Sequence, residues 1–312
     1  MWKYILKRIL LMIPVLLGVT IFIFFVMELS PGDPASTILG SGATQEAIDK
    51  LNHELGYDRG MFERLGSYLL DVFTRLDFGN SYRTRQPVID AILPCIPVSL
   101  RTALFAITFA ALVGIPVGVL SAVKQYSLLD TIPTVFSLFL SALPGFWLGM
   151  MLLYCFSLKL GWLPSYGVDS WKCFILPTIS LGLPYAAQEM RFTRSSMLDT
   201  IRADYVRTAR AKGAAERRVI WKHALKNALL PVITVTGNNF AAMVGGAVVT
   251  ENLYTIPGLG SLLVTSIKIK DVPTVMGCTL ILAAVCSIVL LLVDLLYAYV
   301  DPRIKAKYSK TR

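Results

Sequence analysis

Charged residues are scarce in this 312-residue chain, at 16% against about 25% in a typical soluble domain. The shortage is uneven, because six stretches contain no Asp, Glu, Lys or Arg at all. They are residues 9–27, 102–123, 131–158, 173–188, 227–250 and 272–293. About 20 apolar residues in a helix cross the hydrocarbon core of a membrane. This composition excludes an ordinary soluble protein and predicts an all-α integral membrane protein with six transmembrane helices.

Two of these stretches need separate arguments. The fourth has only 16 residues, so we expect its helix to continue through Glu189, Arg191 and Arg194, whose long side chains reach toward the interface. The first follows basic residues, as the core of a signal peptide would. Signal cores, however, have roughly 7–15 residues and end at a small-x-small site. A run of 19 apolar residues followed by ELSPGDP instead predicts a retained helix over 1–28.

Sequence motifs for nucleotide binding, metal binding and nucleophilic catalysis are also missing. The chain has no G-x-x-x-x-G-K-[ST] phosphate loop, no H-E-x-x-H zinc motif and no G-x-S-x-G nucleophile motif. It has two histidines, and its five cysteines lack the C-x-x-C spacing of zinc and redox sites. We therefore expect no catalytic, cofactor or metal residues. A disulfide between Cys95 and Cys173, both expected near the outer face, is an alternative to five unpaired cysteines.

Acidic residues near membrane depth are few. They are Glu28, Glu189, Glu251 and Asp294, and the sequence places all four toward helix ends. We expect Asp294 to pair with a basic residue of the tail or of a neighbouring helix. A stand-alone secondary transporter would need a more central charge, and a lipid-processing enzyme would need a His/Asp/Ser or metal cluster at the interface. The membrane region therefore resembles a conduit without its own energy source.

Basic residues predict the orientation. With the N-terminus inside, the inner segments hold nineteen Lys and Arg, whereas the short outer loops hold four. Segment 29–97 holds six more, but loops beyond about 60 residues escape the positive-inside rule. Both termini are therefore expected to be cytoplasmic. This topology and an anionic inner leaflet explain the net charge of +10 without nucleic acid.

Segment 29–97 is the one sizeable extramembrane piece. The prolines and glycine of SPGDPA are expected to end the first helix. Apolar residues then recur at helical spacing over 61–76, which predicts an amphipathic helix, and DFGNSYRTRQP predicts turns and a loop. These pieces are too small for a catalytic domain, so we expect an extracytoplasmic cap on the helix ends.

A basic segment, 202–230, separates two of the apolar stretches. It begins RADYVRTARAKG, and its residues Tyr205, Thr208, Ala209 and Lys212 share one face of a short helix. Gly213 is expected to end that helix, because glycine adopts the left-handed conformation without strain. Such a short helix is unstable alone in water. We therefore expect it to dock on a cytoplasmic partner, the alternative being a plain basic loop.

A second helix is expected over about 215–229. Its residues Val219, Ile220, Ala224 and Ala228 face one way, while most of its basic residues lie elsewhere. Such a helix is suited to lying along the inner leaflet of the membrane.

The pattern Y-V-x-x-A-x-x-K-G, with a proline 18 residues after the glycine, resembles the cytoplasmic loop of permease subunits in binding-protein-dependent ABC importers. In that family the loop forms a coupling helix that fits a cleft on the ATP-hydrolysing subunit. The resemblance assigns this contact to Asp204, Tyr205, Arg207, Thr208, Ala209, Lys212 and Gly213. The general motif begins Glu-Ala-Ala, whereas this chain has Arg207, Thr208 and Ala209, which is similar to the dipeptide/oligopeptide/nickel branch.

Further motifs resemble the same branch: LSPGDPA (29–35), FGNSYRTRQPV (78–88), ENLYTIPGLGSLLV (251–264) and LLVDLLYAYVDPRIK (291–305). The resemblance implies the transmembrane domain of a type I ABC importer in the bacterial inner membrane. Its parts would be a helix (1–28), a cap (29–97), a core (98–300) and a cytoplasmic tail (301–312). The implied partners are a homologous second permease, two ATP-binding subunits and an extracytoplasmic solute-binding protein. The implied solutes are peptides, with nickel or a metal chelate as the alternative.

Overall fold

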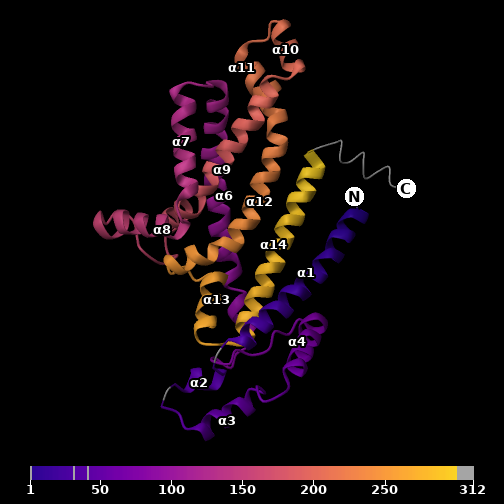
Figure 1. Ribbon diagram of the computed structural model, residues 1–312, viewed down its shortest axis with the longest axis vertical. Coiled ribbons are helices and arrows are strands. Elements are labelled where there is room, and N and C mark those ends of the chain that lie inside the picture. Colours follow the sequence, from indigo (N-terminus) through magenta and orange to yellow (C-terminus); the bar gives the residue numbers. More distant parts are fainter. Residues whose placement is uncertain (1, 31, 41, 301–312) are drawn as a thin grey trace.

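Long helices form the body of the protein. The computed structural model describes residues 2–30, 32–40 and 42–300. The long helices are α1 (Trp2–Leu29), α6 (Cys95–Val123), α9 (Ile175–Ile201), α12 (Leu225–Leu253) and α14 (Val272–Val300). They run between two ends of the molecule, with α10 (Asp204–Ala211) at one end and the short helices that follow α1 at the other (Figure 1). The predicted tail, 301–312, lies outside the described residues.

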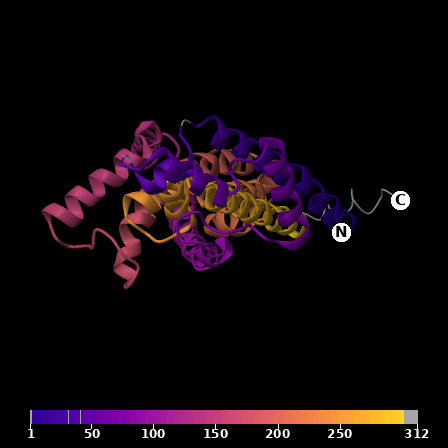
Figure 2. The same ribbon diagram turned by 90° about the horizontal axis from the view of Figure 1, so that it is seen from below.

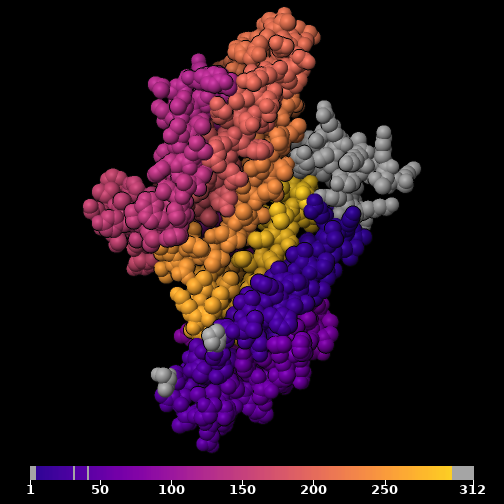
Figure 3. Space-filling model, viewed as in Figure 1, coloured from indigo at the N-terminus to yellow at the C-terminus, as the bar shows by residue number. Residues whose placement is uncertain are grey.

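The surfaces of these helices are apolar where lipid would cover them. In the most apolar parts of α1 and α14, only 11% and 17% of the residues are buried. Phe22 and Leu112, for example, have exposed fractions of 69% and 71%. Figure 3 shows α1 lying along α14 at the edge of the bundle. A helix satisfies its own backbone hydrogen bonds, so it presents an apolar exterior that suits the hydrocarbon of a membrane.

In residues 2–30, 32–40 and 42–300, four helices are long and apolar enough to cross a membrane, or five if a bent pair of helices counts as one span. The helix α9 is not among them, because its second half carries Glu189, Arg191 and Arg194. Length and composition therefore confirm a membrane-spanning, all-helical chain in the described residues but do not confirm the predicted number of six spans.

The bent pair interrupts the uncharged stretch 131–158. Here α7 (Leu128–Ala142) and α8 (Gly145–Leu152), which continues as a π-helix over Leu153–Lys159, meet at an angle of 102°. Pro144 lacks the N–H that would continue α7, and Leu143 before it is extended, as residues before proline prefer. The stretch is therefore not one straight helix, and α8 projects sideways from the bundle (Figures 1 and 2).

The most extensive helix packing lies between α6 and α9. Gly114 and Gly118 are four residues apart on the α6 face that meets α9. A Cβ added at either position would come within 2.5 Å of a backbone oxygen of α9, at Ala186 or Met190. Small residues at this spacing let the backbones of two membrane helices approach closely.

In its described residues, the cap of segment 29–97 contains four short helices: α2 (Pro34–Leu39), α3 (Gln45–Glu54), α4 (Met61–Arg75) and α5 (Val88–Ile92). The predicted amphipathic helix and the predicted end of the first helix are thus confirmed. An ion pair between Arg64 and Glu28, with N–O distance 2.5 Å, joins α4 to the end of α1. The Arg64 guanidinium also stacks on the Tyr57 ring, 4.1 Å from its centroid. These contacts hold the cap against the bundle.

A second anchor of the cap lies at the start of α14. Buried Asp271 accepts hydrogen bonds from the hydroxyl of Ser81, at 2.5 Å, and from the backbone N–H of Tyr82, at 2.8 Å. Lys270 donates to the carbonyls of Ser30 and Gly32. The loop before α5 and the end of α1 are therefore both fixed to the turn between α13 (Leu259–Lys268) and α14.

The four predicted membrane carboxylates differ in position. Asp294 pairs with Arg8 of the neighbouring helix α1 at 2.9 Å, which confirms the expected kind of partner. Glu189, however, lies in the middle of α9 and is fully buried, so its placement toward a helix end is wrong. The reason is that α9 continues to Ile201, two turns beyond Arg194, the last residue through which the helix was expected to run. All five cysteines are unpaired, so the alternative disulfide Cys95–Cys173 is not formed.

Candidate functional site

The basic segment 202–230 contains a short helix, α10, with a defined end. In α10 the Thr208 hydroxyl donates to the carbonyl of Asp204, one turn back. At the other end, the N–H of Gly213 bonds to Arg210 O at 2.9 Å and that of Ala214 bonds to Ala209 O at 3.3 Å. This pair of bonds, with Gly213 at φ 78°, is a Schellman motif. The expected end of the helix at Gly213 is confirmed.

One side chain anchors α10 to the membrane helices. Val206 is fully buried in an apolar cluster at the α10 end of the bundle. The other buried members of this cluster are Val119, Ala122, Met197, Val219, Ala224 and Ala228. Although α10 alone is too short to be stable, this contact with α6, α9 and the start of α12 fixes its position.

The residues assigned to the partner contact divide into two groups. Most are exposed: Asp204, Tyr205, Arg207, Thr208, Lys212 and Gly213. Ala209 is half-buried and packs against the apolar cluster, so it does not share a fully exposed face with the other three residues of the predicted pattern. The free surface of α10 is therefore polar and centred on Tyr205, Thr208 and Lys212.

A salt bridge closes the turn after α10. The guanidinium of Arg210 donates from Nε and Nη2 to the two carboxylate oxygens of Glu216, at 3.1 and 2.7 Å. These bonds raise the pKa of Arg210 above its ordinary value. The bidentate geometry fixes the angle between α10 and α11 (Glu216–Arg218) more firmly than a single contact would.

The second predicted helix, 215–229, is not a separate element. It forms α11, a π-helical turn over Val219–Ala224 and the first residues of α12, and the helix is continuous from Glu216 to Leu253. Its residues Val219, Ala224 and Ala228 are buried in the cluster around Val206. The expectation that this helix lies on the inner leaflet is therefore wrong, because its apolar face packs on protein.

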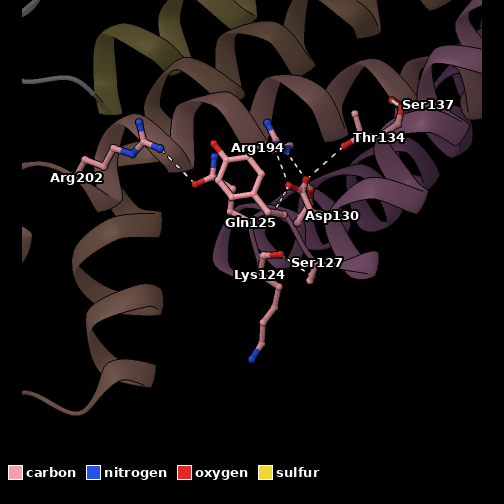
Figure 4. Close-up of polar contacts among 10 residues, drawn as sticks. Lys124, Gln125, Ser127, Asp130, Thr134, Ser137, Arg194 and Arg202 are labelled. Carbon is pink, nitrogen blue, oxygen red and sulfur yellow. Dashed lines mark hydrogen bonds and ion pairs between the residues drawn. The ribbon is translucent and has the colours of Figure 1, made fainter.

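The turn between α6 and α7 lies beside the base of α10. Asp130 at the start of α7 is buried, and it accepts hydrogen bonds from Arg194 Nε and Nη2 at 2.5 and 2.8 Å (Figure 4). It also accepts from the Ser121 hydroxyl and from the Tyr126 N–H. Arg202, at the junction of α9 and α10, donates to Gln125 at 3.3 Å. Through these contacts the ends of α6 and α9 nearest to α10, the start of α7 and α10 itself form one packed unit.

Val206 and the pair Asp130–Arg194 were not singled out from the sequence. Val206 is the one strongly apolar residue in DYVRTARA, and that isolation could have marked it as an anchor. Asp130 directly precedes an uncharged stretch, and Arg194 follows another at the same predicted side of the membrane. Opposite charges at the ends of two predicted membrane helices, on the same side of the membrane, could have indicated that Asp130 and Arg194 form a pair.

The described residues contain no group of three or more His, Cys, Asp or Glu side chains that could hold a metal ion. What the segment offers instead is an exposed helix on a fixed base, which is suited to contact with another protein.

Comparisons with known proteins agree with this organisation. Residues 114–306 match the family of binding-protein-dependent transport system inner membrane components, and residues 1–103 match the N-terminal family of the same components. The dipeptide transport system permease protein DppB of Alkalihalophilus pseudofirmus is 39% identical, over 98% of this chain and all of its own length. The glutathione transport system permease protein GsiC of Escherichia coli is 37% identical with the same coverage.

Two solved structures share the fold. The inward-facing MetNI methionine ABC transporter aligns with a TM-score of 0.58 at 18% identity, covering 68% of this chain and 97% of its own. An amino acid ABC transporter with histidines aligns with a TM-score of 0.53 at 13% identity, covering 69% and 94%. Together with the family matches, these similarities show that the chain belongs to the inner membrane permease components of binding-protein-dependent ABC transport systems.

Proposed function

We propose that this chain is a transmembrane permease subunit of an ABC importer for peptides, driven by ATP hydrolysis on partner subunits. The similarity to permeases for a dipeptide and for glutathione, over nearly the full length, carries the proposal. The complex would contain a homologous second permease, two ATP-binding subunits and an extracytoplasmic solute-binding protein. Nickel or a metal chelate is the alternative solute, since the sequence motifs resemble a branch that includes such permeases.

The proposed role of Asp204 to Gly213 is to contact the ATP-binding subunit and to transmit its motion to the membrane helices. The observation that supports this is the fixed base of α10: Val206 is buried, Arg210 pairs with Glu216, and Gly213 closes the helix. Force passes through a packed element, whereas a slack loop would absorb it. The exposed residues Tyr205, Thr208 and Lys212 would make the contact.

The proposed topology has six spans and both termini in the cytoplasm. It counts α7 with α8 as one broken span and α9 as the next. At about 1.5 Å per residue, the 27 residues of α9 make a helix about 40 Å long, which exceeds the thickness of a hydrocarbon core. The location would be a bacterial inner membrane, with α10 on the cytoplasmic side and the cap outside.

The cap and segment 251–270 would form the docking surface or lid for the solute-binding protein. The exposed apolar residues of α4, among them Phe62 and Leu70 with exposed fractions of 73% and 66%, support such a contact. A cap that only covers the helix ends is the competing proposal.

Reconstitution tests the proposed function. The two permeases and two ATP-binding subunits would be placed in lipid vesicles with the solute-binding protein and a labelled dipeptide. Uptake of dipeptide that requires ATP and the binding protein is the expected result. Uptake of a nickel chelate without uptake of any peptide would support the alternative. Uptake by this chain alone would contradict both.

A further inference from the structure

A cleft lies where the α7–α8 bend meets α9 and α12. Its volume is about 550 Å³, and its walls include Leu143 and Phe146 from the bend, Tyr185, Gln188 and Arg191 from α9, and Thr250 from α12. Apolar walls with a few convergent polar groups are typical of sites for small molecules. Tyr185, Gln188 and Arg191 follow one another at intervals of three residues, so they lie along one side of α9.

Arg191 is the charged residue of this cleft. Its Nη1 donates to the carbonyl of Ser137 at 2.9 Å and to the Ser141 hydroxyl at 2.6 Å, both on α7. Within the described residues, no carboxylate forms an ion pair with it. Arg194, one turn further along α9, differs in this respect because Asp130 neutralises it.

The acidic residue of α9 nearest in sequence to Arg191 does not neutralise it. Glu189 is fully buried and accepts a hydrogen bond from Asn239 of α12 at 3.4 Å. It does not line the cleft, whose described lining contains no acidic side chain. Arg191 therefore gives the cleft a positive charge.

An unneutralised arginine within a membrane bundle is costly and marks a pathway for a charged solute. A guanidinium has five N–H donors in a planar fork that matches a carboxylate. The two contacts of Nη1 orient Arg191 but leave Nε and Nη2 without a partner in the described part of the chain. The amide of Gln188, an exposed neighbour in the cleft, adds a donor and an acceptor for a peptide group.

We propose that this cleft is a binding subsite on the transport pathway and that Arg191 binds the carboxylate of the transported solute there. The inference rests on the proposed function, because it assigns a role to the free carboxylate that peptides carry.

The test measures solute binding without the solute-binding protein, so that the selectivity of that protein does not enter. The complete complex of permeases and ATP-binding subunits, in lipid nanodiscs, is titrated with alanyl-alanine and with its C-terminal amide. The amide keeps the shape of the dipeptide and lacks the carboxylate. The variants are Arg191→Gln, Arg191→Lys and the control Arg101→Gln, whose arginine stacks on Phe174 and lies outside the cleft.

We expect the unmodified complex to bind the dipeptide at least about tenfold more tightly than the amide, the scale of a hydrogen bond to a charged group. Arg191→Gln should remove this preference, while Arg191→Lys and Arg101→Gln should keep it. If Arg191→Gln fails to assemble, Arg191→Lys tests the proposal instead. Lysine keeps the positive charge without the planar fork, so this variant should bind more weakly and still prefer the dipeptide over its amide. Equal binding of both compounds, no binding at millimolar concentration, or an undiminished preference in Arg191→Gln would overturn the proposal.

An uptake assay of the same complex with its binding protein distinguishes a failure of the subsite from a failure of the proposed function. If the unmodified complex imports alanyl-alanine but shows no carboxylate preference in nanodiscs, the subsite is wrong and the proposed function stands. If it imports no peptide, the proposed function itself fails.

Discussion

Asp130 and Arg194 are 64 residues apart in the sequence, yet the guanidinium of Arg194 makes two hydrogen bonds to the Asp130 carboxylate. The Asp130 side chain is 5% exposed and that of Arg194 is 25% exposed. Because Asp130 lies in the first turn of α7 and Arg194 lies about two turns before the end of α9, this pair joins α7 to the part of α9 that leads into α10.

Asp130→Asn should destabilise the complex, since it leaves the partly buried guanidinium of Arg194 without its counter-ion. Breaking a buried pair costs about 3–5 kcal/mol, and the exposed part of Arg194 places the expected loss at the lower end. The measurement is the thermal unfolding temperature of the purified complex. Arg75→Gln in α4 is the control, because its contact with Asp71 is long, at 3.6 Å, and exposed. Equal unfolding temperatures for both variants would contradict the structural role of the pair.

Gly114→Val should separate α6 from α9. A Cβ at this position would meet Ala186 O at 2.5 Å and Glu189 Cβ at 2.9 Å, so backbone must move. We expect a loss of about 1–3 kcal/mol or more, as for other overpacked sites, visible as reduced yield and a lower unfolding temperature. Gly18→Val in α1 is the matched control, since nothing lies within 4 Å of its added Cβ. The close packing of α6 and α9 is refuted if both variants behave alike.

The proposed orientation predicts which positions an external reagent reaches. A cysteine introduced at Glu46 of α3 should react with a membrane-impermeant maleimide in cells with an intact inner membrane, and one at Lys212 should react only after lysis. Both positions are exposed in the chain itself, and the chain is produced without the ATP-binding subunit so that the proposed contact does not cover Lys212. The experiment uses a background in which the native cysteines, above all exposed Cys155, are replaced by serine. Labelling at Lys212 in sealed cells would reverse the topology.

The exposed apolar side of α4 should contribute to binding of the solute-binding protein. Phe62→Glu together with Leu70→Glu should weaken that association at least about tenfold, because central apolar contacts often cost over 1 kcal/mol each when removed. Both side chains point to solvent, so the unfolding temperature should not change. A pull-down with the purified binding protein gives the affinity. Unaltered binding and transport would favour the cap as a passive cover.

Individual residues show which features of the structure could be predicted from the sequence. The helix over 61–76 and the end of α10 at Gly213 were both predictable, because apolar periodicity and the conformational freedom of glycine act over a few residues. Amphipathicity of 215–229 was also visible, but an apolar face does not reveal whether lipid or protein covers it. The pairing of Asp130 with Arg194 depends on helices distant in sequence. The cleft at Arg191 depends on a bend at Pro144, whose angle no local pattern gives.

The central claim is that Asp204 to Gly213 couples ATP hydrolysis to transport, and substitution of Gly213 tests it most directly. At φ 78° a β-branched residue is strained by about 1 kcal/mol or more, whereas asparagine tolerates this conformation. Nothing lies within 4 Å of an added Cβ, so Gly213→Val and Gly213→Asn differ in backbone strain and not in crowding. In complexes matched for assembly, we measure solute-stimulated ATP hydrolysis together with peptide uptake. The account predicts that both fall in Gly213→Val and are largely kept in Gly213→Asn; normal stimulated hydrolysis and normal uptake in the fully assembled valine variant would contradict it.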